Sequence, residues 1–518
     1  MGLLTAGTVS VVATLSGPSA VPSGFGRAVR CLEVRADLAG DLDPAPLRED
    51  FPGPLLYTLR SVAEGGRCAD PPDLRRARLL AAADRYDLID LEADRDLDLR
   101  HRIPPERRVI SWHGPAIGLT GLRRRFQALS AVPAGCYRLG ARADSPAAAV
   151  VPLLLLKSLG RADVTAYATG PAGMWTRMVA ARFGAPVIFG RLDDAPTATP
   201  GQRDDQRDGQ RDSRPSDRPG DRSSGPIDDQ PPLDRLLADY PPQLLTGAQR
   251  LYAIIGAETT RSLAPLVYNT AYHRLGLPAL YVPISTTDLP RALAELVPGL
   301  DRLGLPLAGA TVVAPHKDAA FALASRASRL ARRAAAASLL IRTRQGWRAD
   351  TEAAGVVATL AGRTVTVAGR RVAVVGCGGA GRAAAAGLAQ AGAEVTLVNR
   401  GTAGGLRAAR LLGLPFVPLC DFDPRPYAVL VHATPVTDAV PFPVGGLAPG
   451  TVVFDLNYRA EDTPLVAAGR AAGHVTIDGR QLLLVELARQ FRLMTGRRMP
   501  AADVRAALGL PVPQGERS

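Results

Sequence analysis

The sequence predicts an α/β protein in which an N-terminal (β/α)8 barrel precedes a two-domain unit that contains a Rossmann domain. Three observations lead to this fold class. Short apolar strands alternate with helical stretches through residues 1–202, a low-complexity segment then interrupts the pattern, and a glycine-rich strand-turn-helix motif follows near residue 376. A chain of 518 residues is also too long for a single hydrophobic core.

The composition argues against several classes of function. The net charge of +13 comes from 62 Lys and Arg interspersed with 49 acids, and only 5% of the residues are aromatic. Because no basic stripe with stacking aromatics is present, we expect no nucleic-acid binding. No apolar run is long enough to span a membrane. The five scattered cysteines predict reduced thiols and a cytoplasmic protein. We expect no metal site, and an oligomer is compatible with the sequence.

Eight strands are expected in the first unit, at residues 7–15, 29–34, 55–59, 87–91, 108–112, 135–139, 164–168 and 186–190. In a (β/α)8 barrel the residues at the carboxyl ends of the strands form the catalytic face. Polar residues occupy these ends, namely Glu33, Arg35, Arg60, Glu92, His113 and Arg138. A structural ion pair would explain any one of them, but their recurrence at strand ends favours a binding or catalytic site.

Six motifs in this region resemble type I 3-dehydroquinate dehydratase. They are C-L-E-V-R-A-D (31–37), T-L-R-S-V-A-E-G-G (58–66), D-L-E (90–92), S-W-H (111–113), W-T-R (175–177) and P-G-Q (200–202). The resemblance implies that the carboxylate and hydroxyls of the substrate are held by Glu33, Arg35, Arg60, Arg177 and Gln202. It also implies that His113 is the general acid/base.

One position departs from that family. The dehydratases form a Schiff base through a lysine, and the matching position here holds Arg138. An arginine stays protonated and cannot attack a ketone to form an imine. Lys157, in an apolar stretch expected to be helical, is the alternative amine. We therefore expect a barrel that binds its ligand but is impaired in dehydration, with a fully bifunctional protein as the alternative.

Residues 203–230 are rich in Arg, Asp, Pro, Gly and Ser and cannot pack a core. Residues 233–240 are expected to form the last helix of the barrel. The low-complexity segment is therefore predicted to be a disordered insertion near the barrel mouth, inside a barrel domain that covers residues 1–245.

Residues 371–400 are typical of a dinucleotide-binding fold, with strands expected at 372–376 and 395–398 and a helix at 382–391. Gly376, Gly378 and Gly381 have G-x-G-x-x-G spacing, which lets backbone N–H groups and a helix N-terminus approach a pyrophosphate. Arg400 follows the second strand, where an acid would favour NAD. An arginine attracts a 2′-phosphate instead, so the predicted cofactor is NADP, with Arg400 and Thr402 on the phosphate.

The second half resembles shikimate dehydrogenase. The matching stretches are RSLAPLVYNTAYHRLGL (261–277), AGATVVAPHKDAA (308–320), A-T-P (433–435), D-L-N-Y (455–458) and D-G (478–479). The order of the two halves resembles the fused dehydratase–dehydrogenase of the shikimate pathway. The resemblance implies a substrate-binding domain at 246–360, an NADP-binding domain at 361–475 and C-terminal helices at 476–518 that pack back on the substrate domain.

The same resemblance implies the site residues of this half. The catalytic pair would be Lys317 and Glu352, where the family has Asp at the second position. Substrate contacts would come from Ser262, Asn269, Ser338, Tyr458 and Glu486. The cofactor would lie on Gly376, Gly378, Gly379, Ala380, Gly381, Asn399, Arg400, Thr402 and Thr434.

Lys317 is one of only two lysines in a chain with 62 Lys plus Arg, which favours a chemical role that arginine cannot fill. Ala264 and Val313 stand where the family has hydroxyl side chains, so the preferred substrate is open. The expected reaction is NADP-dependent interconversion of 3-dehydroshikimate and shikimate, with 3-dehydroquinate or quinate as alternative ligands. A metabolite-binding pseudoenzyme is the competing hypothesis.

Overall fold

The computed structural model describes residues 9–17, 28–192, 229–459, 461–508 and 510. The chain divides into two compact units, Met1–Gly247 and Ala248–Ser518. In the described part of the chain, no helix is both long and apolar enough to cross a bilayer.

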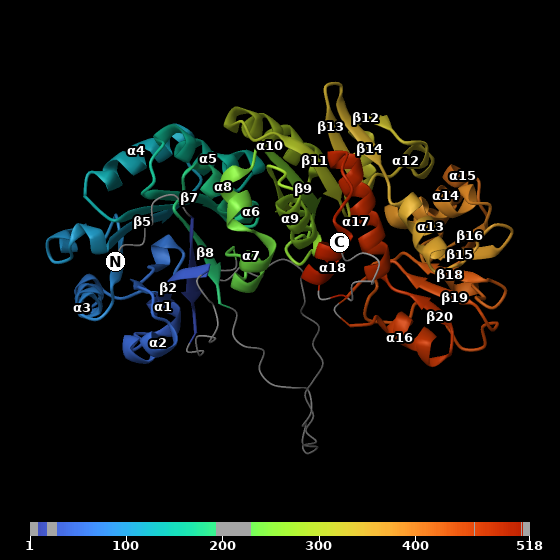
Figure 1. Cartoon of the computed structure of the whole chain (residues 1–518), viewed down its shortest axis with the longest axis horizontal. Helices are drawn as coiled ribbons and strands as arrows, with labels where there is room; N and C mark the ends of the chain where they lie inside the picture. Colours follow the sequence, from blue (N-terminus) through green and yellow to red (C-terminus); the bar gives the residue numbers. More distant parts are fainter. Residues whose placement is uncertain (1–8, 18–27, 193–228, 460, 509, 511–518) are drawn as a thin grey trace, which may run out of the picture. The chain divides into compact units, whose positions relative to one another are not determined.

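The first unit contains eight parallel strands in the order β7-β6-β5-β4-β3-β2-β1-β8 (Figure 1). They are β1 (Ser10–Leu15), β2 (Val29–Arg35), β3 (Leu55–Thr58), β4 (Leu88–Glu92), β5 (Arg108–Gly114), β6 (Cys136–Arg142), β7 (Val164–Thr169) and β8 (Val187–Arg191). Among the described strands, no ladder joins β7 to β8, but Thr165 Oγ1 donates to the Val187 carbonyl at 3.1 Å across this seam. The predicted barrel is therefore confirmed as a nearly closed one.

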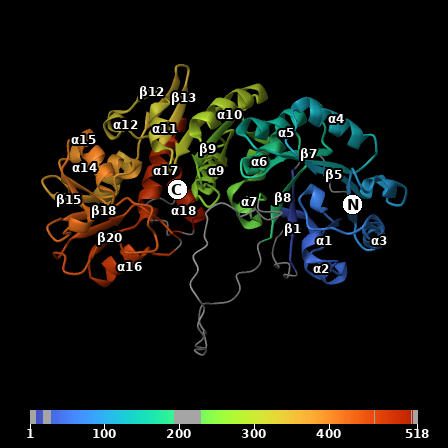
Figure 2. The same ribbon diagram turned by 180° about the vertical axis from the view of Figure 1, so that it is seen from behind.

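Helices surround this barrel on its outer side (Figures 1 and 2). They are α1 (Ala36–Ala39), α2 (Pro44–Asp50), α3 (Pro72–Ala83), α4 (Leu119–Ser130), α5 (Pro146–Leu159), α6 (Met174–Ala180), α7 (Leu233–Asp239) and α8 (Pro242–Gly247), with short 3-10 turns at Val62–Glu64, Leu97–His101, Pro105–Arg107 and Ala181–Phe183. Helix α5 shows why local sequence suffices for such elements: the Ser145 side chain caps its first turn, and Gly160 ends it in the left-handed conformation.

The second unit begins with a mixed sheet in the order β10-β9-β11-β13-β14-β12. Its strands are β9 (Arg250–Gly256), β10 (Ala279–Ser285), β11 (Leu307–Val312), β12 (Ala324–Ala327), β13 (Leu339–Thr343) and β14 (Gly346–Asp350). Its helices are α9 (Ala264–Arg274), α10 (Leu289–Leu303), α11 (Lys317–Ala322), α12 (Arg329–Ala334) and α13 (Ala353–Gly362).

A second, fully parallel sheet follows in the order β17-β16-β15-β18-β19-β20, which is the doubly wound arrangement. Its strands are β15 (Arg371–Val375), β16 (Glu394–Asn399), β17 (Phe416–Pro418), β18 (Val429–His432), β19 (Val452–Asp455) and β20 (Val475–Ile477), and its helices are α14 (Gly379–Gln390), α15 (Thr402–Leu412) and α16 (Pro464–Ala471). A short 3-10 turn lies at Leu419–Asp421. Because both faces are covered, the central strands are apolar on both sides.

The chain then returns to the first sheet of this unit. Helix α17 (Gly479–Thr495) contacts α9, α13 and β11, and helix α18 (Ala501–Ala507) contacts α9 (Figures 1 and 2). Residues far apart in sequence, such as Thr311 and Gln490, therefore meet beside α17.

Candidate active sites

The inside of the barrel is built in two layers. Near the amino ends of the strands lies an apolar layer formed by Val12, Cys31, Leu56, Leu88, Val109, Cys136, Val187 and Phe189. Side chains two positions along a strand point to the same face. The next inward positions are therefore those of Thr14, Glu33, Thr58, Asp90, Ser111 and Arg138, which are all buried. Along the strands, an apolar layer at the base of the barrel is therefore followed by a polar and charged layer just below the catalytic face.

Arg138 and Glu33 form the centre of the charged layer. Arg138 Nη1 lies 2.6 Å from Glu33 Oε1, its Nε donates to Tyr167 Oη at 2.8 Å, and its guanidinium lies 3.7 Å from the centroid of the Phe189 ring. Burial would raise the pKa of Glu33, but the Arg138 and Arg35 guanidiniums and a bond from Thr14 lower it to about 2. Arg138, which the resemblance to the dehydratases places at the lysine position, is thus an arginine paired with Glu33 and bonded to Tyr167.

His113 is held between an acid and a phenol. Its backbone N–H donates to Glu64 Oε2 at 2.8 Å, its Nδ1 lies 3.3 Å from the same oxygen, and its Nε2 lies 3.0 Å from Tyr167 Oη. Gly140 on the adjacent strand makes room, since a Cβ there would fall 2.4 Å from the His113 ring. Burial and nearby arginines, Arg60 foremost, hold the pKa of His113 well below its ordinary value, and burial raises that of Glu64. A neutral imidazole beside a protonated acid suits proton transfer.

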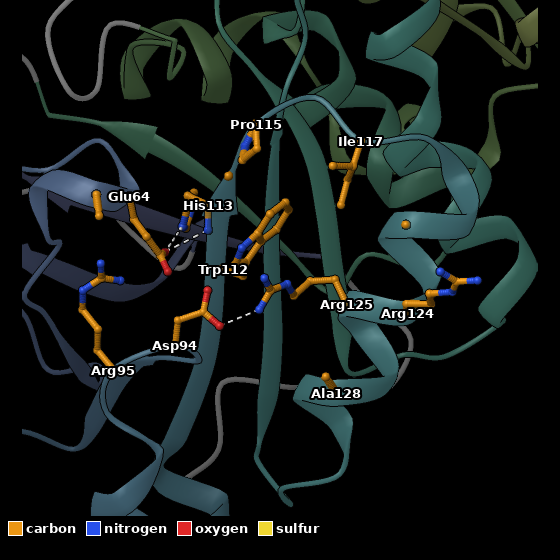
Figure 3. Close-up of a pocket in the computed structure, with 13 residues that line it drawn as sticks. Glu64, Asp94, Arg95, Trp112, His113, Pro115, Ile117, Arg124, Arg125 and Ala128 are labelled. Carbon is orange, nitrogen blue, oxygen red and sulfur yellow. Dashed lines mark hydrogen bonds and ion pairs between the residues drawn. The ribbon is translucent and has the colours of Figure 1, made fainter.

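Glu64 was missed by the sequence analysis, although a signal was present. It follows Arg60 by four residues and ends the short helical turn Val62–Glu64, and the two side chains meet at 3.1 Å. Figure 3 shows the Glu64 carboxyl directed at His113 on one wall of a hollow of about 690 Å³, where Arg125 also reaches Asp94 beside Trp112. Glu64 and His113 thus separate this outer hollow from the barrel mouth.

The barrel mouth itself is a cavity of about 420 Å³. Four of the predicted site residues line it, namely Arg35, Arg60, His113 and Arg177, together with Arg138, Glu64, Tyr167, Asp229 and Gln230. Glu33 lies just beneath, bonded to Arg138. The concentration of guanidinium groups makes this cavity suited to a small carboxylate ligand.

The predicted substrate residue Gln202 lies outside the described residues. The glutamine that the structure brings to the barrel mouth is Gln230, which is buried. The prediction of a disordered insertion is wrong for its last two residues. Asp229 is hydrogen-bonded to Arg177, and the Gln230 carbonyl to Arg191. The remainder of that insertion, residues 203–228, is outside the described part.

Lys157 does not reach this cavity. It lies in the last turn of α5, on the outer helical layer, and its side chain is exposed. The alternative amine considered for imine formation is therefore on the wrong side of the barrel wall.

In the second unit Lys317 and Glu352 form an ion pair. Lys317 is the first residue of α11, and its Nζ donates to Glu352 Oε1, while Thr351 Oγ1 donates to Glu352 Oε2 at 3.1 Å. Burial would raise the pKa of Glu352, but the charge of Lys317 and its hydrogen bond lower it. Glu352 is therefore an ionised carboxylate that can orient the Lys317 ammonium.

Lys317 also contacts the glycine turn of the dinucleotide-binding sheet. A Cβ on Gly379 would fall 2.8 Å from the Lys317 Cβ, so only glycine permits this approach. The predicted general acid/base and the predicted cofactor turn are therefore neighbours, as hydride transfer to a ketone with simultaneous protonation requires.

The glycine turn fits a dinucleotide. A Cβ on Gly381 would fall 1.8 Å from the Gly376 carbonyl oxygen, and one on Gly376 would fall 2.8 Å from the Ala433 carbonyl carbon, so both glycines are required by close packing. A Cβ on Gly378 would meet no atom within 4 Å, which leaves the N-terminus of α14 open. Backbone N–H groups there can hold a pyrophosphate.

Asn399 holds the turn at the end of β16, where a 2′-phosphate contact was predicted. Asn399 Oδ1 accepts from the Cys377 N–H at 3.2 Å, and its Nδ2 donates to the Gly401 carbonyl at 2.8 Å. These two hydrogen bonds of Asn399 hold the turn that follows the strand, and the side chains of Arg400 and Thr402 are exposed there.

Thr434 is positioned by a buried network that sequence reasoning did not identify. Its Oγ1 lies 2.5 Å from His432 Nε2, and His432 Nδ1 lies 3.0 Å from Asp455 Oδ1. Asn457 Nδ2 donates to the Thr434 carbonyl at 2.8 Å. Because Ala433 packs on Gly376, the network fixes the strand end opposite the glycine turn.

Glu486 lies in a buried polar chain. Gln490 Nε2 donates to Glu486 Oε1 at 3.0 Å, and Thr311 Oγ1 donates to Gln490 Oε1 at 2.7 Å. Within the described residues, Glu486 Oε2 is buried and has no hydrogen-bond partner, and Gly355 leaves it room. Burial raises the pKa of Glu486 to about 8.

The remaining predicted substrate residues differ in placement. Asn269 does not fit a substrate contact, because its amide exchanges two hydrogen bonds with the Tyr281 backbone, at 2.8 and 3.0 Å, and is fully buried. Ser262 accepts from the Ala264 N–H at 3.1 Å, at the start of α9. Ser338 lies beside Glu352, and Tyr458 is exposed.

Comparison with known families agrees with both halves. Residues 27–205 match the family described as type I 3-dehydroquinase, and residues 254–340 match the shikimate dehydrogenase substrate binding domain. Shikimate dehydrogenase (NADP(+)) of Acidiphilium cryptum is 35% identical over 251 residues, which cover 46% of this chain and 88% of that protein.

Two further proteins are similar to this chain, one over nearly all of its length and one over half of it. The chloroplastic bifunctional 3-dehydroquinate dehydratase/shikimate dehydrogenase of Arabidopsis thaliana is 24% identical over 504 residues, covering 90% of this chain and 77% of that protein. The crystal structure of shikimate 5-dehydrogenase from Thermus thermophilus, in complex with NADP(H) and shikimate, is 29% identical, with a TM-score of 0.45, and covers 50% of this chain and 97% of that chain.

Proposed function

Since the chain belongs to the shikimate dehydrogenase family and carries a type I 3-dehydroquinase domain in its N-terminal half, we propose that it reduces 3-dehydroshikimate to shikimate with NADPH. The observation that carries this proposal is the contact of Lys317 with the glycine turn at Gly379. It joins a proton donor to the predicted cofactor site.

Reduction of the ketone needs a hydride at the carbonyl carbon, which bound NADPH supplies, and a proton at the oxygen. Lys317 donates that proton as negative charge develops on the oxygen, and Glu352 holds the ammonium in place. In the reverse direction Lys317 accepts the proton of the shikimate hydroxyl. Glu352 is longer than the family's Asp, and Thr351 fixes its second oxygen, which supports the same role.

Cofactor preference follows from the end of β16. Arg400 and Thr402 are exposed beside a turn that Asn399 holds, and no acid follows the strand to repel a 2′-phosphate. We propose that these two residues select NADP over NAD.

For the barrel we propose binding of a carboxylate metabolite of the 3-dehydroquinate type without Schiff-base dehydration. The arginine-lined cavity supports binding, and the pairing of Arg138 with Glu33 supports the loss of imine chemistry. A bifunctional protein is the second candidate. The similarity to a bifunctional relative over 90% of the chain and the His113–Glu64 pair both favour it.

Two measurements test these proposals. Steady-state rates with shikimate and quinate, each with NADP and NAD, test the dehydrogenase; absence of NADP-linked turnover with both substrates would contradict it. Incubation with 3-dehydroquinate and borohydride, followed by mass spectrometry, tests the barrel. An unchanged mass and no dehydration are expected, whereas release of 3-dehydroshikimate would establish the bifunctional alternative.

A further inference from the structure

The guanidinium of Arg177 is bound by an acid of the chain itself. Its Nη2 lies 3.1 Å from Asp229 Oδ2, and its Nε donates to the Asp229 carbonyl at 3.1 Å. The same Asp229 oxygen accepts from the Gly170 N–H at 3.3 Å. Arg177 stacks on the Tyr167 ring at 3.8 Å from its centroid, so its plane is fixed.

Arg177 differs from the other arginines of the mouth. Arg35, Arg60 and Arg138 pair with acids of the barrel strands or of the helix directly after one. Of these four arginines, only Arg177 forms an ion pair with an acid that comes after the last barrel strand in the sequence, namely Asp229. In the described residues, its buried Nη1 has no hydrogen-bond partner. Arg177 lines the cavity, and a buried guanidinium with an N–H that lacks a hydrogen-bond partner favours an anion beside it.

The position of Asp229 is fixed by the backbone that follows it. The Arg191 N–H at the end of β8 donates to the Pro231 carbonyl at 2.9 Å, and Arg191 Nη1 donates to the Gln230 carbonyl at 3.2 Å. Gln230 is buried. The Asp229 carboxylate is therefore held at the cavity wall by its neighbours as well as by Arg177.

We infer that Asp229 is an internal ligand of the barrel, which occupies the guanidinium face that a bound carboxylate would use and so sets the affinity of the cavity for small carboxylic acids. An incoming carboxylate either displaces Asp229 from Arg177 or binds beside Arg177 next to a fixed negative charge. In both cases binding is weaker than it would be with a neutral residue at position 229. The inference rests on the proposal that the barrel binds a carboxylate metabolite.

The test compares the full-length wild type with Asp229→Asn, which keeps the size of the side chain and removes its charge. Titration calorimetry with 3-dehydroquinate is expected to give a Kd about tenfold or more lower for D229N. The gain in affinity should vanish in an Arg177→Lys background, because Arg177 is the group for which Asp229 competes with the ligand. The control is Asp144→Asn, which removes an exposed acid paired with Arg142 at the rim of the same cavity. It should leave the Kd within about twofold, as surface pairs contribute little.

Equal affinity of wild type and D229N, or an equal gain in D144N, would overturn the inference while leaving barrel binding intact. Failure of every variant to bind 3-dehydroquinate would instead contradict the proposed binding function. In that case the role of Asp229 is tested without a ligand, by measuring how fast phenylglyoxal modifies Arg177, with the modified residue mapped by mass spectrometry. Faster modification of Arg177 in D229N supports the inference, and an unchanged rate overturns it.

Discussion

Replacement of Glu486 by glutamine should change how the stability of the dehydrogenase half depends on pH. The Glu486 carboxyl is 7% exposed, accepts from Gln490 and Arg489, and lies near the acids Glu352 and Asp350. Glutamine keeps the acceptor oxygen and the size of the side chain and removes only the ability to ionise. The variant therefore isolates the protonation of one group.

The sign and size of the effect follow from the two pKa values. In the unfolded chain Glu486 ionises at its ordinary value of 4.5, whereas burial keeps it protonated to about 8 in the folded chain. Between these values the native state binds one proton more than the unfolded state. The free energy of unfolding therefore falls with rising pH by about 1.4 kcal/mol per unit. From pH 5.5 to 7.5 the loss is about 3 kcal/mol.

Differential scanning calorimetry of the full-length protein measures this loss. The dehydrogenase transition is identified as the one that NADP shifts upward. Relative to Glu486→Gln, the wild-type transition should drop by roughly 5–10 °C between pH 5.5 and 7.5. Glu394→Gln, which removes an exposed acid of the same unit, should follow the wild type. Parallel profiles of wild type and E486Q would show that Glu486 is ionised in the native state and would refute the reasoning.

Three further substitutions test the proposed chemistry. Lys317→Arg should lower kcat by roughly 10²-fold or more with little change in KM, because arginine keeps the charge but does not release a proton near neutral pH; equal turnover would contradict the mechanism. Arg138→Lys should give a borohydride-stable adduct with 3-dehydroquinate, seen as a mass increase absent from the wild type, and no adduct would mean that the rest of the barrel site is misplaced. Arg400→Asp should erode the preference for NADP in kcat/KM ratios, and an unchanged ratio would assign the selection to another residue.

Placement of the barrel strands was predictable because it depends on local patterns. Short β-branched runs bounded by turn residues indicated all eight, with ends within a few residues of those observed. The glycine turn was predictable for a related reason, since Gly376 and Gly381 are required by contacts within one strand-turn-helix unit and at its neighbouring strand. Helix α14 begins at Gly379, three residues before the expected start, because the Gly378 carbonyl already accepts a helical hydrogen bond from the Arg382 N–H.

Side-chain partners across the fold were less accessible to sequence reasoning. Glu64 reaches His113 over 49 positions, and Gln490 reaches Thr311 over 179. No local pattern encodes such pairs. Asn269 was predicted to contact substrate from its motif, but its amide is used by the backbone of the adjacent strand.

The sequence by itself determined the order of the domains, the strands that carry the polar residues, the cofactor turn and the chemical types of Lys317 and Arg138. The partner of Lys317, Glu352, was also expected from the sequence. Only the tertiary structure decided which acids pair with the arginines of the barrel: Arg138 pairs with Glu33, and Arg177 pairs with Asp229. Strand periodicity and glycine spacing are properties of neighbouring residues, whereas the charge state of a buried group depends on atoms that only the folded chain brings within a few ångströms.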